Sequence, residues 1–188
     1  MRKLRIVLSG GKIRSFLCVK KLLFPLCCGI IKAKKLKTQQ GGKCNGCFQE
    51  VLNSKIYVDK SELIQYTNSV LRTTQKYICV SRPRRFGKSM AANMLTAYYS
   101  RGCDSREMFQ GLKIAKHTGF EEHLNQYNVI HLNMRDYLTE SENMKQLIQF
   151  VEEDLLDELQ QEFADLRMPR RKTLVKVLEQ AFAQYKIP

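Results

Sequence analysis

The residues best suited to chemistry in this chain form an octapeptide that ends in Gly-Lys-Ser. Its members are Arg82, Pro83, Arg84, Arg85, Phe86, Gly87, Lys88 and Ser89. In a phosphate-binding P-loop, backbone N–H groups at a helix N-terminus face the phosphates, a Lys reaches the outer phosphates and a Ser hydroxyl ligates Mg²⁺. We therefore expect this loop to bind ATP and Mg²⁺. Gly87 would allow close approach of the backbone, Lys88 would contact the β- and γ-phosphates, and Ser89 would hold the metal.

The flanks of the octapeptide are those that a P-loop needs. Residues Lys76–Ser81 are short, apolar and β-rich, which predicts a buried parallel strand. Residues Ser89–Ser100 contain strong helix formers and no Gly or Pro, which predicts a helix. The full pattern G-x-x-x-x-G-K-[ST] would place Gly at position 82, where this chain has Arg82. The alternative is a surface turn whose basic side chains, Arg84 and Arg85 included, are only solvated.

Two further segments join the octapeptide in resembling a known family. Tyr57–Ile64 reads Tyr-Val-Asp-Lys-Ser-Glu-Leu-Ile, and Met108–Ile114 reads Met-Phe-Gln-Gly-Leu-Lys-Ile. Together, over roughly Phe48–Pro188, they resemble the AAA-ATPase-like P-loop proteins of bacteria, in which Arg commonly replaces the first Gly. The resemblance implies an α/β fold of the P-loop NTPase type, with a mainly parallel sheet and flanking helices. It also suggests that Asp59 and Lys60 pack near the nucleotide, although a solvated strand-to-helix turn fits them equally well.

The acidic motif of an ATPase is harder to find. Hydrolysis needs an apolar strand that ends in Asp, to hold Mg²⁺ and position water. The candidate, Val129–Asp136, is interrupted by His131, Asn133 and Arg135. By resemblance, the acidic strand would follow Ala183–Pro188, and a nuclease-like domain of the PD-(D/E)xK kind would come later. We therefore expect the N-terminal part of a truncated ATPase domain, which binds ATP without predictable catalytic residues. Asp136 as a metal ligand is the competing interpretation.

Charge divides the chain into a basic arm and a balanced remainder. Residues 1–49 hold 12 Lys or Arg and no Asp or Glu, whereas the other 139 residues hold 20 basic and 18 acidic side chains. We assign residues 1–47 to a poorly ordered, Cys-rich extension and residues 48–188 to the P-loop domain. A dozen unopposed cations could bind nucleic acid or anionic lipid non-specifically. The arm would then be the active part of a non-catalytic nucleic-acid-binding module, or the whole chain would be an inactive gene product.

The cysteines and apolar runs of the arm allow further interpretations. Cys27, Cys28, Cys44 and Cys47 could supply four thiolates to Zn²⁺, but adjacent ligands strain a tetrahedral site. Leu22–Ile31 is short, contains Pro25 and lacks a cleavage motif, so it does not predict a signal peptide. We expect no transmembrane segment and a cytoplasmic protein, with its oligomeric state left open.

The rest of the sequence predicts scaffold elements. We expect a capping box and short helix at Asp104–Glu107, a short helix at Phe120–Gln126, a strand at Tyr127–Met134, a second capping box at Thr139–Glu142, a long helix from Met144 that Pro169 ends, and a last helix from Leu174. His117, His123 and His131 lack the spacing of a metal pair, and we expect them to be surface or strand residues.

Overall fold

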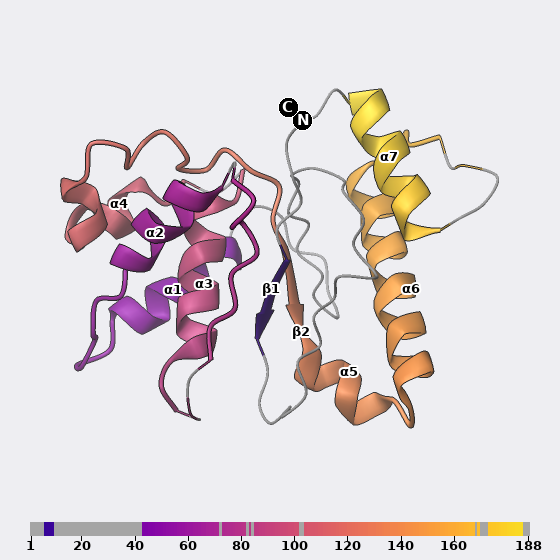
Figure 1. Cartoon of the computed structure of the whole chain (residues 1–188), viewed down its shortest axis with the longest axis horizontal. Coiled ribbons are helices and arrows are strands. Elements are labelled where there is room, and N and C mark those ends of the chain that lie inside the picture. The colour runs from indigo at the N-terminus through magenta and orange to yellow at the C-terminus, as the bar shows by residue number, and fades with distance from the viewer. Residues whose placement is uncertain are drawn as a thin grey trace. The chain divides into compact units, whose positions relative to one another are not determined.

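A computed structural model describes residues 6–9, 43–71, 73–81, 83, 85–101, 104–167, 169 and 173–185; for 6–9, 43–45 and 182 it describes the backbone alone. These residues belong to two compact units, Lys37–Tyr127 and Met1–Leu36 with Asn128–Pro188. The elements, labelled in Figure 1, are β1 Ile6–Ser9, α1 Lys43–Leu52, α2 Glu62–Val70, α3 Lys88–Tyr99, α4 Arg106–Gln110, the 3₁₀ helix η1 Lys113–Lys116, β2 Ile130–Asn133, α5 Met134–Glu140, α6 Met144–Glu162 and α7 Leu174–Tyr185. No helix in the described ranges is both long enough and apolar enough to cross a bilayer.

The unit Lys37–Tyr127 is built around helix α3 and an aromatic core. The Phe48 and Phe109 rings stack with centroids 5.3 Å apart, and Tyr98 meets Phe109 edge-on at 5.5 Å. All three side chains are buried. Aromatic pairs in these geometries add to the free energy gained from burying their large apolar area. The core therefore fixes α1, α3 and α4 against one another, and α3 is the element that the octapeptide enters.

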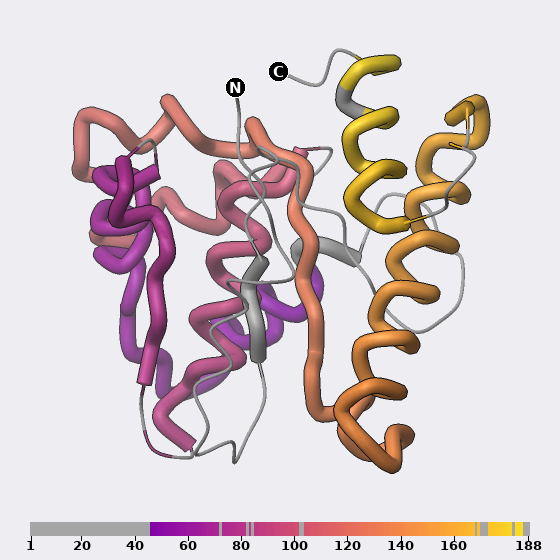
Figure 2. Tube along the Cα trace, turned by 45° about the vertical axis from the view of Figure 1, so that its right-hand side comes forward, coloured from indigo at the N-terminus to yellow at the C-terminus, as the bar shows by residue number. Residues whose placement is uncertain are grey.

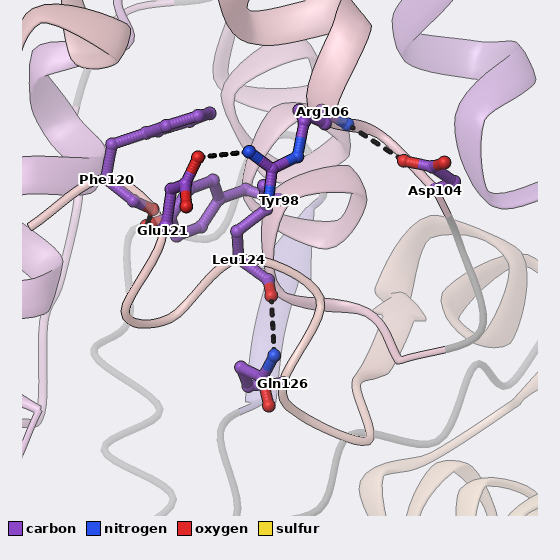
Figure 3. A network of polar contacts seen from close by, with 7 residues as sticks. All are labelled: Tyr98, Asp104, Arg106, Phe120, Glu121, Leu124 and Gln126. Carbon is purple, nitrogen blue, oxygen red and sulfur yellow. Dashed lines mark hydrogen bonds and ion pairs between the residues drawn. The ribbon is translucent and has the colours of Figure 1, made fainter.

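Buried hydroxyl groups in this core are satisfied by hydrogen bonds. Tyr98 Oη donates to the Phe120 carbonyl over 2.6 Å, and Asn68 Nδ2 donates to Tyr98 Oη over 3.1 Å. Figure 3 shows Tyr98 beside the Arg106–Glu121 ion pair, which joins the start of α4 to the turn after Phe120. Burial raises the pKa of Tyr98, so the phenol stays protonated as a donor. These bonds hold the segment after η1 against α3.

The second unit combines a parallel strand pair with three helices. β1 and β2 pair in parallel from Ile6↔Ile130 to Ser9↔Asn133. Ile130 and Leu132 are buried, while the alternate residues of β2 are more exposed. Helices α6 and α7 lie side by side (Figure 2), and α6 also packs against α5. The buried apolar residues of α6 and α7 include Leu147, Leu155, Leu159, Leu174, Val177, Leu178 and Ala181.

The predicted strand at Lys76–Ser81 is wrong. The segment has no strand geometry, and the Tyr77 and Val80 side chains are 71% and 45% exposed. An apolar run becomes a strand only where a neighbouring strand pairs with it and other elements cover it. The parallel partner of β2 among the described residues is instead Ile6–Ser9, from the basic arm. In that part of the chain the expected parallel sheet is a single two-stranded ladder.

Most other element predictions are confirmed, with shifted ends. The predicted helices before Ser100, around Arg106, after Met144 and after Leu174 correspond to α3, α4, α6 and α7, and the predicted strand contains β2. Phe120–Gln126 forms turns rather than a helix. The capping box at Asp104–Glu107 is confirmed in part, because Asp104 Oδ1 accepts from the Arg106 N–H over 3.4 Å although Ser105 makes no side-chain capping bond. The box at Thr139–Glu142 is wrong, because Thr139 and Glu140 end α5. Helix α6 begins after Asn143, whose side chain accepts from the Gln146 N–H, and it ends at Glu162, well before Pro169.

Candidate functional site

The octapeptide forms an exposed loop that leads directly into α3. Arg82 and Arg84 lie outside the described residues. Two backbone positions of the loop have positive φ, Arg85 at 67° and Gly87 at 73°. Such a conformation costs a non-glycine residue about 1–2 kcal/mol, whereas glycine adopts it freely. Turns with left-handed residues can gather backbone N–H groups into anion-binding concavities.

Lys88 and Ser89 stand at the first positions of α3. The Lys88 ammonium donates to the Pro83 carbonyl over 2.9 Å, so its side chain folds back across the loop. The Ala91 N–H donates to the Gly87 carbonyl over 2.9 Å as the first turn of the helix closes. N–H groups that precede this bond have no acceptor within a helix and carry the positive end of the helix dipole. Ser89 is exposed at this end, where its hydroxyl can reach a ligand.

The segment before α2 contacts the loop directly. The Lys60 ammonium donates to the Phe86 carbonyl over 2.9 Å. A Cβ atom added to Gly87 would lie 2.7 Å from Lys60 Nζ, so the ammonium sits against the residue that precedes α3. Sequence reasoning placed Lys60 near the site only through the family resemblance. No spacing rule could have supplied its contact with Phe86, because 26 residues separate the two.

Asp59 and Ser61, on either side of Lys60, accept hydrogen bonds from Met108–Ile114, the third segment of the family resemblance. Asp59 Oδ2 accepts from the Lys113 N–H over 2.8 Å, and Ser61 Oγ accepts from the Ile114 N–H over 3.1 Å. Asp59 Oδ1 also accepts from the Ser61 N–H over 2.8 Å. The three segments that were separate in the sequence therefore meet around one short turn, Asp59–Ser61.

The electrostatics of Asp59 follow from these bonds. Partial burial of the carboxyl opposes ionisation, but the Lys113 and Ser61 N–H groups together outweigh it and hold the pKa of Asp59 below its usual value. The carboxylate thus accepts hydrogen bonds from the backbone, and the positive charge of Lys113 lowers its pKa further. The Lys113 ammonium itself pairs with Glu62 over 3.3 Å.

The other candidates are an aspartate, a histidine and the cysteines of the basic arm. Asp136 is exposed in α5, where Asn133 Nδ2 donates to its Oδ2 over 2.9 Å. His123 is buried, and its Nδ1 lies 2.6 Å from Tyr127 Oη. Cys27 and Cys28 lie outside the described residues, the Cys44 side chain is not described, and Cys47 is an exposed free thiol. Where side chains are described, no three His, Cys, Asp or Glu residues gather as metal ligands.

The comparison with protein families covers most of the chain. The model of the AAA-ATPase-like family, described as "Predicted AAA-ATPase", matches residues 47–188. No curated protein and no solved structure matches the chain. The matched range contains the octapeptide and both companion segments that converge on the turn Asp59–Ser61. By this match and these motifs, the chain belongs to the AAA-ATPase-like family.

Proposed function

We propose that the chain binds ATP and Mg²⁺ through the loop Arg82–Ser89. The observation that carries the proposal is the geometry at Gly87 and Lys88. A left-handed glycine opens α3, and the ammonium of the next residue folds over the loop to the Pro83 carbonyl. Family membership supports a nucleotide as the ligand. A mainly parallel α/β P-loop fold for residues 48–188, with residues 1–47 as an extension that supplies β1 to its strand pair, is part of the same proposal.

Each residue has a distinct role in this proposal. Lys88 turns from the Pro83 carbonyl to the outer phosphates, and the N–H groups that open α3 donate to phosphate oxygens. The Ser89 hydroxyl ligates Mg²⁺, with the exposed Asp136 as the competing metal ligand. Arg85 adds positive charge around the triphosphate of ATP, and so do Arg82 and Arg84, its neighbours in the sequence. The proposal covers binding; it assigns no residue to hydrolysis.

Thermal unfolding with and without Mg-ATP tests the proposal. At a ligand concentration 100 times Kd, binding stabilises the folded state by about 2.7 kcal/mol. For a chain of this size that corresponds to a rise in Tm of about 5–10 °C. Lys88→Ala is expected to abolish the rise, and the control Lys145→Ala, an exposed lysine of α6, is expected to keep it. A wild-type protein that folds but shows no shift at millimolar Mg-ATP would contradict the proposal.

The charge segregation favours one second candidate, non-specific nucleic-acid binding by residues 1–47. All 12 basic residues of positions 1–49 lie within this arm, without an acidic side chain. Deleting the arm would also delete β1, so substitution is the better test. Replacing Lys32, Lys34, Lys35 and Lys37 by Gln should weaken retention of single-stranded DNA and flatten its salt dependence. Unchanged retention and salt dependence would exclude this role.

A further inference from the structure

We propose that Lys60 is a second phosphate-binding ammonium of the loop, acting beside Lys88 on the polyphosphate tail of the nucleotide. The inference rests on the proposed function and deepens it. Its starting point is the position of Lys60 Nζ, 2.9 Å from the Phe86 carbonyl and against Gly87. An ammonium has three N–H donors. The Phe86 carbonyl takes one of them, which leaves donors for phosphate oxygens at the same place.

The turn around Lys60 is fixed from both sides, while the Lys60 side chain reaches away from it. Asp59 and Ser61 anchor the backbone to the N–H groups of Lys113 and Ile114, and Ser61 is fully buried. Lys60 itself is exposed and directed to the loop. A fixed backbone lowers the entropic cost of placing a long, flexible side chain at a ligand. A fixed backbone with an exposed, directed side chain is the arrangement expected of a ligand-binding residue rather than of a packing residue.

The charges around the loop point to an anion. Among the described residues, neither Lys60 nor Arg85 forms an ion pair with a carboxylate. The neighbouring acids are committed elsewhere, Asp59 to backbone N–H groups and Glu62 to Lys113. Lys60, Arg85 and Lys88 therefore concentrate positive charge at the N-terminus of α3, where the helix dipole has the same sign. A polyphosphate tail neutralises such a cluster, whereas an uncharged ligand does not.

Binding of Mg-ATP and of inorganic tripolyphosphate with Mg²⁺, each at low and high salt, tests the inference. Lys60→Met should weaken both ligands about 10-fold or more, the effect of losing a hydrogen bond to a charged group. It should also reduce the salt dependence of affinity, because one screened charge pair is lost. Lys60→Arg keeps the charge and should keep the salt dependence. Lys55→Met, an exposed lysine of the preceding turn, is the matched control and should behave as wild type.

The outcomes separate this inference from the proposed function. If Lys88→Ala abolishes binding while Lys60→Met leaves affinity and salt dependence unchanged, Lys60 has no ligand role and the proposed function stands. If Lys60→Met does not fold, or if it loses affinity with unchanged salt dependence and a lowered Tm of the free protein, the lysine is a structural brace and the inference is overturned. If wild-type protein binds neither ligand, both proposals fail together.

Discussion

At the scale of single residues, Gly87 is the most constrained backbone position of the loop. Its φ of 73° strains any other residue, and an added Cβ would lie 2.7 Å from Lys60 Nζ. Gly87→Ala is therefore expected to lower the free energy of unfolding by about 1–2 kcal/mol. Denaturant unfolding measures this loss, and Mg-ATP binding should weaken with it because Lys60 and the loop must move apart.

Gly111 provides the matched control for Gly87. It ends α4 with φ −84°, and an added Cβ would meet nothing within 4 Å. Gly111→Ala should change stability by less than about 1 kcal/mol, with stabilisation the expected sign because the unfolded chain loses freedom. Equal losses in the two variants would show that the conformation at Gly87 is not what requires glycine.

Asp59 is expected to make stability depend on acid pH. Its folded-state pKa is lowered, so its contribution is present above the unfolded pKa of about 4 and is lost as pH falls through the folded value. Asp59→Asn removes the charge and turns one acceptor into a donor that faces the Lys113 or Ser61 N–H. At pH 6 the free energy of unfolding of the variant should be about 1–3 kcal/mol below that of the wild type. Denaturant unfolding of both proteins from pH 6 to pH 3 measures this difference. The difference from wild type should shrink toward pH 3; a constant difference would exclude titration of Asp59.

At the scale of elements, the sequence predicts helices well and the sheet poorly. The stripe Leu147–Leu155–Leu159 lies within a single helix, so its periodicity is enough to predict α6. The segment Tyr77–Val80 consists of residues that favour strands, yet whether it forms a strand depends on pairing partners that the local sequence does not specify. β1 shows the converse, because four residues of a basic arm form a strand by pairing with β2, 124 positions away. The meeting of Lys60 with Phe86 likewise depends on tertiary packing.

The start of α6 shows a local signal that was available but misassigned. Asn143 Oδ1 accepts from the Gln146 N–H over 3.0 Å, and Gln146 Oε1 accepts from the Glu142 N–H over 2.8 Å. This pair resembles a capping box, with Asn and Gln at its usual spacing of three, but the Gln146 side chain binds the N–H of the residue before the cap. Asn143→Ala should therefore cost about 1 kcal/mol of unfolding free energy. Thr139→Ala, at the predicted box, should cost little; a larger loss in Thr139→Ala than in Asn143→Ala would reverse the assignment of the cap.

At the scale of the whole molecule, the two units should respond differently to nucleotide. The hydrogen bonds of the loop with Lys60 and within it, from Lys88 to Pro83, lie within Lys37–Tyr127, whose core includes Phe48 and Tyr98. The other unit has its own buried core, with Leu155 and Val177. Compact units with buried cores of their own can open in separate steps, and their amides then exchange at different rates. Ligand binding should therefore slow exchange in the first unit and leave α6 and α7 unchanged.

Hydrogen exchange with Mg-ATP at 100 times Kd measures this difference. Openings that break the site should slow by about 100-fold, because the ligand must leave before they occur. The affected amides should be those of residues 59–61, 85–91 and 113–114. Hydrogen bonds of the Asp59–Ser61 turn and of Lys60 join these segments, which lie far apart in the sequence. Lys88→Ala with the same ligand is the control and should show no protection. Equal protection of α3, α6 and α7 would instead show that the two units open together. Nucleotide binding at the loop would then stabilise the whole chain rather than only the unit that contains the loop.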